Sequence, residues 1–150
     1  MEKILVTGGR GLVGKAINNI VGVDSRYHFT NSSETDLYQY ESCRELFQKH
    51  QPTKVIHLAA NVGGLFKNMN QKVNMLEKNL IINYNVVKCS HEFGVKRFIG
   101  CLSTCIFPDK TTYPINEDML HNGPPHPSND AYAYAKRMLE IQCRSYREQY

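Results

Sequence analysis

Short apolar runs alternate with segments of helical period through most of the chain. The runs typical of buried strands are residues 3–7, 27–30, 55–60 and 97–102. The segments with helical period are residues 12–21, about 40–50 and about 74–93. Strands that alternate with helices predict a doubly wound, Rossmann-like α/β fold, with a parallel sheet, flanking helices and right-handed crossovers.

The pattern is irregular between some of these elements and after the fourth strand. Residues 61–70 and the proline-rich residues 107–128 predict loops. A last helix follows, and its cap is expected within the Ser-Asn-Asp run at 128–130. Its pattern continues to Tyr150. Since a doubly wound sheet seldom ends inside a helix, we expect the sheet to be incomplete at the C-terminus and the chain to be part of a longer protein.

Composition and charge argue against several classes of protein. A net charge of +4, spread over scattered Lys and Arg, forms no basic stripe of the kind that binds nucleic acid. Apolar runs stay well short of the roughly 20 residues of a membrane span, and the chain enters its first strand without a signal-like segment. The five cysteines form no CxxC pair and, like the histidines, show no metal-ligand spacing. We therefore expect free thiols, no metal site and a cytoplasmic protein.

A glycine-rich loop joins the first strand to the first helix. It follows Thr7 and has the G-x-x-G-x-x-G spacing of a dinucleotide site. Gly8 allows the tight turn, Gly11 lets backbone amides approach a pyrophosphate, and Gly14 permits close packing of helix on strand. The predicted cofactor contacts in this loop are Gly8, Gly9, Arg10, Gly11, Leu12, Val13 and Gly14.

The end of the second strand indicates which dinucleotide binds. NAD-selective sites usually place a carboxylate there for the ribose 2′-hydroxyl, whereas residues 30–33 of this chain contain no acid before Glu34. Arg10 could instead pair with a 2′-phosphate, which favours NADP(H) over NAD. The alternative is an Arg10 side chain that points into solvent.

Two further segments are candidates for cofactor contact. Asp36 and Leu37 could receive the adenine, although a surface turn explains the pair equally well. The segment Leu58, Ala59, Ala60 leaves space beside a cofactor at the end of the third strand. His57, inside that strand, is more typical of an interior histidine with satisfied hydrogen bonds than of an acid or base.

The last helix carries Tyr132 and Lys136, four residues apart. At this spacing the two side chains share one helix face, with Cβ atoms roughly 6 Å apart. A nearby ammonium favours the phenolate and lowers the pKa of a tyrosine. Ser103, at the end of the fourth strand, could hold a substrate oxygen that the tyrosine protonates. Tyr134 points in a different direction from Lys136 and is expected to be a packing residue.

These elements together resemble the extended short-chain dehydrogenase/reductase family along essentially the whole chain. The most specific stretches are Val62-Gly63-Gly64, Ser103-Thr104-Cys105-Ile106-Phe107-Pro108, Asn122-Gly123-Pro124-Pro125-His126 and Tyr132 to Lys136. They are similar to a branch of NADP-dependent epimerase-reductases that converts GDP-4-keto-6-deoxy-D-mannose to GDP-L-fucose. The resemblance implies an enzyme that epimerises C3 and C5 of this GDP-sugar and then reduces its 4-keto group by hydride transfer.

The same resemblance implies a role for each candidate catalytic residue. Tyr132 would protonate the C4 oxygen, Lys136 would bind the nicotinamide ribose, and Ser103 would hydrogen-bond the 4-oxygen, so Tyr132 and Lys136 are also expected cofactor contacts. Cys105 matches a cysteine that exchanges protons with the sugar during epimerisation. This exchange is possible because the 4-keto group makes C3 and C5 acidic. The structural alternatives are a strand-ending hydroxyl for Ser103 and a buried thiol for Cys105.

Domain organisation and partners also follow from the resemblance. Residues 1–150 would be the N-terminal part of an NADP-binding Rossmann domain, with the substrate domain and the second epimerisation group beyond Tyr150. The helix at 74–93 and the last helix are similar to helices that pair across a two-fold axis, which implies a homodimer. Two alternatives stay open: another nucleotide-sugar epimerase or dehydratase of the same superfamily, and a truncated dinucleotide-binding module without catalytic activity.

Overall fold

The structure is a computed structural model that describes residues 2–150. The chain divides into two compact units. The first contains the residues up to Ala60, Ile81–Cys101 and Tyr150, and the second contains Asn61–Leu80 and Leu102–Gln149. Within residues 2–150, every helix is too short or too polar to cross a lipid bilayer.

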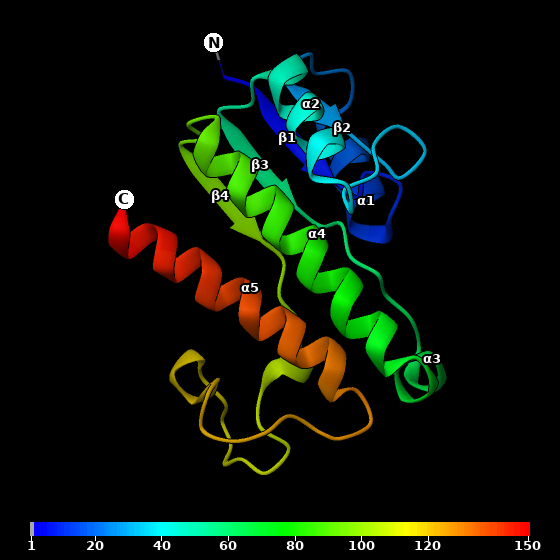
Figure 1. The fold of residues 1–150 in the computed structure, drawn as a ribbon, viewed down its shortest axis with the longest axis vertical. Helices are drawn as coiled ribbons and strands as arrows, with labels where there is room; N and C mark the ends of the chain where they lie inside the picture. The colour runs from blue at the N-terminus through cyan, green and yellow to red at the C-terminus, as the bar shows by residue number, and fades with distance from the viewer. Residues whose placement is uncertain (1) are drawn as a thin grey trace. The chain divides into compact units, whose positions relative to one another are not determined.

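The first unit is built on a four-stranded parallel sheet, shown in Figure 1. Its strands are β1 (Ile4–Thr7), β2 (Tyr27–Phe29), β3 (Lys54–His57) and β4 (Arg97–Gly100), in the order β2-β1-β3-β4. β1 pairs on both sides, so that Leu5 lies opposite His28 of β2 and Val55 of β3. The predicted parallel α/β fold is confirmed.

Strands β3 and β4 end earlier than the sequence pattern predicts. β3 ends at His57 rather than Ala60, and β4 ends at Gly100 rather than Leu102. After β3, the N–H groups of Leu58 and Ala59 donate to Thr7 Oγ1 at 3.2 and 3.1 Å, and the Leu58 N–H also lies 3.3 Å from the Thr7 carbonyl oxygen. At Ala59 the Thr7 side chain thus replaces the backbone of the neighbouring strand as the hydrogen-bond acceptor.

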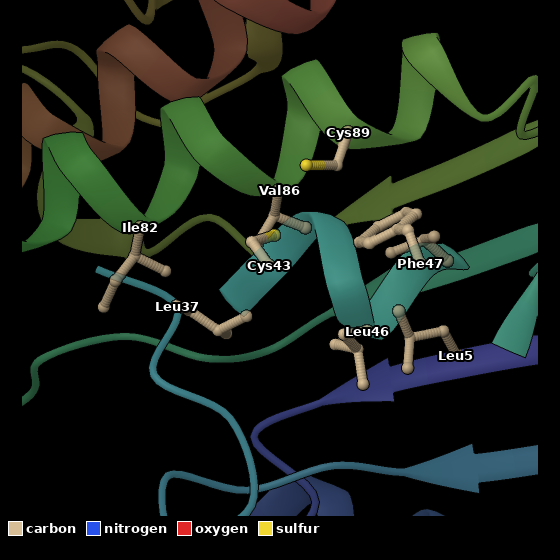
Figure 2. Close-up of a cluster of buried hydrophobic side chains, with 9 residues drawn as sticks. Leu5, Leu37, Cys43, Leu46, Phe47, Ile82, Val86 and Cys89 are labelled. Atoms are coloured by element: carbon tan, nitrogen blue, oxygen red, sulfur yellow. The ribbon is translucent and has the colours of Figure 1, made fainter. Parts of the chain in front are cut away.

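One face of the sheet is covered by α2 (Tyr40–His50) and by residues 81–92 of α4 (Lys72–Glu92). Figure 2 shows Phe47 of α2 and Val86 of α4 in this core with Leu5 of β1. The cluster of buried residues is Leu5, Leu37, Cys43, Leu46, Phe47, Val55, Ile82, Val86 and Cys89. Apolar burial of this kind is the main favourable contribution to folding of the first unit.

Helix α1 (Leu12–Val21) forms where the periodicity predicts it, but much of its apolar face is exposed. Gly14 is its buried residue, whereas Leu12 is 89% and Ile20 85% exposed. The period of the apolar residues therefore predicted the helix correctly and did not predict its contacts.

Helix α4 ends at the glycine that the sequence indicates. Gly94 has a φ of +67°, and its N–H donates to the His91 carbonyl at 3.0 Å. The Val95 N–H donates to the Ser90 carbonyl at 2.9 Å. These two bonds form a Schellman motif, which satisfies carbonyls at the end of the helix.

The second unit contains α3 (Leu65–Asn70), the first residues of α4, and α5 (Asp130–Gln149), with short 3-10 helices at Thr104–Ile106 and Glu117–Met119. The prediction of a loop throughout 61–70 is wrong, because α3 occupies its second half. Asn68 Nδ2 donates to the carbonyls of Gly63 and Gly64 at 3.0 and 3.1 Å. This side-chain contact closes the turn before α3, and apolar periodicity does not detect it.

Helix α5 begins within the run predicted to cap it. The Asn129 carbonyl accepts the first helical hydrogen bond, from the Ala133 N–H at 3.0 Å. Lys72 Nζ lies 2.7 Å from Asp130 Oδ1 and 2.6 Å from the Pro127 carbonyl oxygen. An acid at the first residue of a helix also interacts favourably with the helix dipole.

The burial pattern predicts a large difference between two apolar truncations in the first unit. Phe47→Ala, at a fully buried position, is expected to lower the free energy of unfolding by about 3–5 kcal/mol, since it leaves a cavity in the core. Ile20→Ala, at an exposed position of α1, is the control and should change it by less than about 0.5 kcal/mol. Urea unfolding followed by circular dichroism measures both, and equal effects would contradict this core assignment.

Candidate functional site

The glycine loop lies against the carboxyl ends of β2 and β3, the two strands that flank β1. Gly8 has a φ of +73°, and a Cβ atom there would lie 2.8 Å from Ala59 N. The Gly9 N–H donates to the Thr30 carbonyl at 2.8 Å, and a Cβ on Gly9 would lie 2.8 Å from Phe29 Cβ. A side chain at either position would displace the loop, so contact requires glycine at both, and the positive φ requires it at Gly8 as well.

Helix α1 presents amides directly after this loop. Its N-cap is Gly11, which has no side chain to cap the helix. The first helical hydrogen bond runs from the Lys15 N–H to the Gly11 carbonyl at 2.9 Å, so the amides of residues 12–14 have no helical partner. Uncapped amides and the helix dipole together suit this end of α1 to a pyrophosphate.

Gly14 packs the first turn of α1 onto the loop. A Cβ on Gly14 would lie 2.6 Å from the Gly8 carbonyl oxygen and 2.8 Å from Gly9 Cα. Both neighbours are backbone atoms and cannot rotate away. The close approach of helix and strand that the sequence predicts at Gly14 is therefore present.

Arg10 reaches the segment that follows β2. Its Nη1 donates to Ser33 Oγ at 2.8 Å, and both side chains are exposed. Arg10 is thus exposed to solvent and hydrogen-bonded to the segment after β2, and its contact with a 2′-phosphate stays a prediction. A guanidinium and a hydroxyl lie together at the position where a dinucleotide site distinguishes a 2′-phosphate from a 2′-hydroxyl.

Asp36 and Leu37 belong to a turn in which each has a structural partner. Asp36 Oδ1 accepts the Tyr38 N–H at 3.0 Å. Leu37 is 8% exposed, and its carbonyl accepts a hydrogen bond from Asn85 Nδ2 at 2.9 Å. The turn alternative thus describes this pair, and contact with adenine stays a prediction. Half-buried Leu58, Ala59 and Ala60 follow β3.

The second unit contains all four candidate catalytic residues. Ser103 Oγ lies 3.2 Å from Cys105 Sγ, at the start of the 3-10 helix Thr104–Ile106. On α5, Lys136 Nζ lies 5.9 Å from the centre of the Tyr132 ring, and Lys136 is only 2% exposed. A lysine is almost never buried so fully unless it is paired. The predicted pairing of Tyr132 with Lys136 on one helix face is confirmed.

Arg137 is a buried residue that the sequence pattern did not identify. It is 6% exposed, and its Nε donates to the Ile106 carbonyl at 2.6 Å, which ties α5 to the segment that carries Cys105. Arginine in a helix usually indicates an exposed position, so no sequence signal identified it. Tyr134, predicted to pack, is 43% exposed, and its ring lies 5.5 Å from Arg137 Cζ.

The cysteines other than Cys105 differ in burial. Cys43 and Cys89 are fully buried, and the hydrogen bond between them raises the pKa of the Cys43 thiol. Burial raises the pKa of Cys143 to about 11. Raised pKa values leave little thiolate at neutral pH, so Cys43 and Cys143 are poor nucleophiles or bases. In residues 2–150, His, Cys, Asp and Glu form no group of three or more that could hold a metal ion.

Known proteins share the sequence pattern and the fold of this chain. The model of the NAD dependent epimerase/dehydratase family matches residues 4–150. The chain belongs to this family. Within it, the chain is 56% identical to a GDP-L-fucose synthase of Dictyostelium discoideum over 98% of its own length, and 51% identical to a probable GDP-L-fucose synthase of Drosophila melanogaster over 100%.

A solved structure from the same family has a closely similar fold. The GDP-L-fucose synthetase of Naegleria fowleri bound to NADP superposes with a TM-score of 0.91, is 54% identical, and covers 99% of this chain. The chain covers 48% of that structure, and 47% and 48% of the Dictyostelium and Drosophila proteins. It therefore spans about half the length of these family members.

The contacts of Gly14 predict a specific sensitivity to a single methyl group. Gly14→Ala is expected to lower the free energy of unfolding by about 1–3 kcal/mol, since the methyl meets backbone atoms that must shift. Alanine usually favours a helix over glycine by about 1 kcal/mol, so the sign is the opposite of the ordinary effect.

Gly64→Ala is the matched control for this prediction. A Cβ on Gly64 meets nothing within 4 Å, and its φ of −69° suits alanine. It should change the free energy of unfolding by less than about 0.5 kcal/mol in the same urea experiment. A Gly14→Ala protein as stable as the control would show that helix and loop do not pack as described.

Proposed function

We propose that this chain is the N-terminal, NADP-binding part of an epimerase-reductase that converts GDP-4-keto-6-deoxy-D-mannose to GDP-L-fucose. The observation that carries the proposal is a hydroxyl, a thiol, a phenol and a buried ammonium, contributed by Ser103, Cys105, Tyr132 and Lys136 to one compact unit. Sequence identity of 56% to a GDP-L-fucose synthase supports the choice of substrate. The sugar-binding part and the second epimerisation group would lie in the half that this chain does not cover.

In this proposal the glycine loop holds the cofactor. The amides of residues 12–14 would bind the pyrophosphate, and the absence of side chains at Gly8 and Gly9 would let it approach the backbone. Arg10 and Ser33, already hydrogen-bonded to each other, would bind the 2′-phosphate. Leu58, Ala59 and Ala60 would lie beside the cofactor, and the turn at Asp36 and Leu37 beside its adenine. NADPH, when bound, supplies the hydride for reduction.

Tyr132 would be the general acid of the reduction. Its phenol would give a proton to the C4 oxygen, on which negative charge develops as the carbonyl is reduced. Lys136, buried on the same helix face, would stabilise the phenolate that results and bind the nicotinamide ribose. Ser103 would donate a hydrogen bond to the same substrate oxygen, so that the developing charge has two donors.

Cys105 would exchange protons with the sugar before reduction. The 4-keto group stabilises the enolate that forms when C3 or C5 loses a proton, and reprotonation on the opposite face inverts the centre. The thiol lies 3.2 Å from the Ser103 hydroxyl, which supports action of both residues on neighbouring atoms of one sugar. Arg137 would hold the segment with Cys105 through the Ile106 carbonyl.

Compartment and assembly are part of the proposal. Free thiols at all five cysteines suit a reducing compartment such as the cytoplasm. Tyr134 and Met138, four residues apart on α5, are 43% and 47% exposed and would form part of a homodimer interface. Light scattering on the purified protein would test the dimer.

Cofactor preference tests the role of Arg10. NADPH is expected to bind at least about tenfold more tightly than NADH, since charge-assisted hydrogen bonds to a phosphate contribute about 1.5–3 kcal/mol. Arg10→Ala should weaken NADPH binding to the level of NADH and leave NADH binding unchanged. Arg44→Ala, a surface arginine of α2 paired with Glu41, is the control. Fluorescence titration measures the affinity of each protein for both cofactors, and equal binding of NADPH and NADH by the unmodified protein would refute the assignment.

Two tyrosines on one helix allow a matched test of the general acid. In a full-length enzyme that contains this chain, Tyr132→Phe should lower the rate of 4-keto reduction by about 10²–10⁴-fold, since the proton donor is lost. Its affinity for NADPH should change less than threefold. Tyr134→Phe should retain reduction, because that side chain points elsewhere. Single-turnover oxidation of NADPH gives the rates, and persistent reduction by Tyr132→Phe would remove this residue from its role.

A further inference from the structure

A buried chain of hydrogen bonds connects the end of β1 to α4 through a histidine. His57 is fully buried in the first unit. Its Nδ1 lies 2.8 Å from Thr7 Oγ1, and its Nε2 lies 3.1 Å from Asn83 Oδ1. The prediction of an interior histidine with satisfied hydrogen bonds is confirmed, and its partners give it a further consequence.

The contacts of Thr7 determine which nitrogen of His57 carries the proton. A hydroxyl has one hydrogen to donate and two lone pairs that accept. Thr7 Oγ1 already accepts the Ala59 N–H at 3.1 Å and the Leu58 N–H at 3.2 Å, the latter shared with the Thr7 carbonyl oxygen at 3.3 Å. It must therefore donate its own hydrogen to His57 Nδ1, which leaves Nδ1 unprotonated and places the ring proton on Nε2, directed at Asn83 Oδ1. A protonated Nδ1 would present the Thr7 oxygen with a third donor, for which it has no lone pair.

The same hydroxyl controls the backbone against which the glycine loop packs. Leu58 and Ala59, whose amides Thr7 holds, are also the residues nearest to Gly8. A Cβ on Gly8 would lie 2.8 Å from Ala59 N and 3.0 Å from the Leu58 carbonyl carbon. Thr7 directly precedes Gly8 in the chain. The Thr7 side chain therefore binds the same backbone that the glycine loop contacts at Gly8.

We propose that His57, in its neutral Nε2–H tautomer, is a positioning residue for the dinucleotide site. It orients the Thr7 hydroxyl, which holds the amides of Leu58 and Ala59 and so fixes the backbone beside the Gly8 turn. Asn83 of α4 holds the other side of the ring, which prevents the imidazole from turning away. The inference rests on the proposed binding of NADP by this loop, and His57, which is fully buried, would act through Thr7.

The tautomer can be measured without any cofactor. Long-range proton–nitrogen correlation spectra of the protein at neutral pH should show an unprotonated Nδ1 and a protonated Nε2 for His57. An Nδ1–H tautomer, or a doubly protonated ring, would overturn the inference directly. This result does not depend on whether NADP is the true ligand.

Matched variants at Thr7 and His57 test the effect on binding. Thr7→Val keeps the shape of the side chain and removes the hydroxyl, so NADPH affinity should fall about tenfold, and Thr7→Ser should bind within about threefold of the unmodified protein. His57→Leu should weaken binding like Thr7→Val. His57→Asn retains a side-chain oxygen that can accept from Thr7 and should rescue much of the affinity. Circular dichroism establishes that each variant is folded.

NADPH binding and hydrogen exchange together separate failure of this inference from failure of the proposed function. If the unmodified protein binds NADPH and folded Thr7→Val and His57→Leu bind it equally well, the positioning role is wrong and the function stands. If the unmodified protein does not bind NADPH, the proposed function fails, and with it the role of His57 at a cofactor site. Faster amide exchange at Leu58 and Ala59 in both loss variants, with normal exchange in Thr7→Ser, supports the positioning of this backbone, and unchanged exchange overturns it.

Discussion

The first unit depends on one constraint. The glycine loop makes close contact with the backbone at the carboxyl ends of β2 and β3. Gly8 and Gly9 approach Ala59 and Phe29 so closely that a single added carbon would lie 2.8 Å from an atom of each. The loop therefore reaches helix α1 in one fixed position, with uncapped amides at residues 12–14. Arg10 extends from the same loop to Ser33. The loop therefore positions both the backbone amides and the guanidinium.

The second unit concentrates reactive groups around α5 and the short segment after β4. Two consecutive turns of α5 carry Tyr132, Lys136 and Arg137. Lys136 is buried beside Tyr132, and Arg137 donates a hydrogen bond to the Ile106 carbonyl. A rigid helix is a more accurate support for such groups than a loop. The proline-rich segment before α5 connects Ser103 to the helix that carries Tyr132, and it contains short 3-10 helices but no strand.

Periodicity and spacing predicted much of this fold, and they failed where single side-chain contacts decide. Alternating strands and helices, the glycine loop and the Gly94 cap followed from patterns of residue type. After β3 the Ala59 amide bonds to the Thr7 side chain, and α3 follows a turn closed by Asn68, neither of which repeats along the chain. Exposure of Leu12 and Ile20 could not be predicted, because a helical period does not show what lies opposite.

The central claim is that the amino end of α1 receives the pyrophosphate of NADP. An NADPH titration followed by amide proton–nitrogen correlation spectra tests it most directly. The account predicts that the amides of residues 12–14 shift most strongly, together with the side chain of Arg10. Shifts confined to another surface, such as the crevice lined by Glu2, Arg26 and Lys49, or no shifts at all, would contradict it.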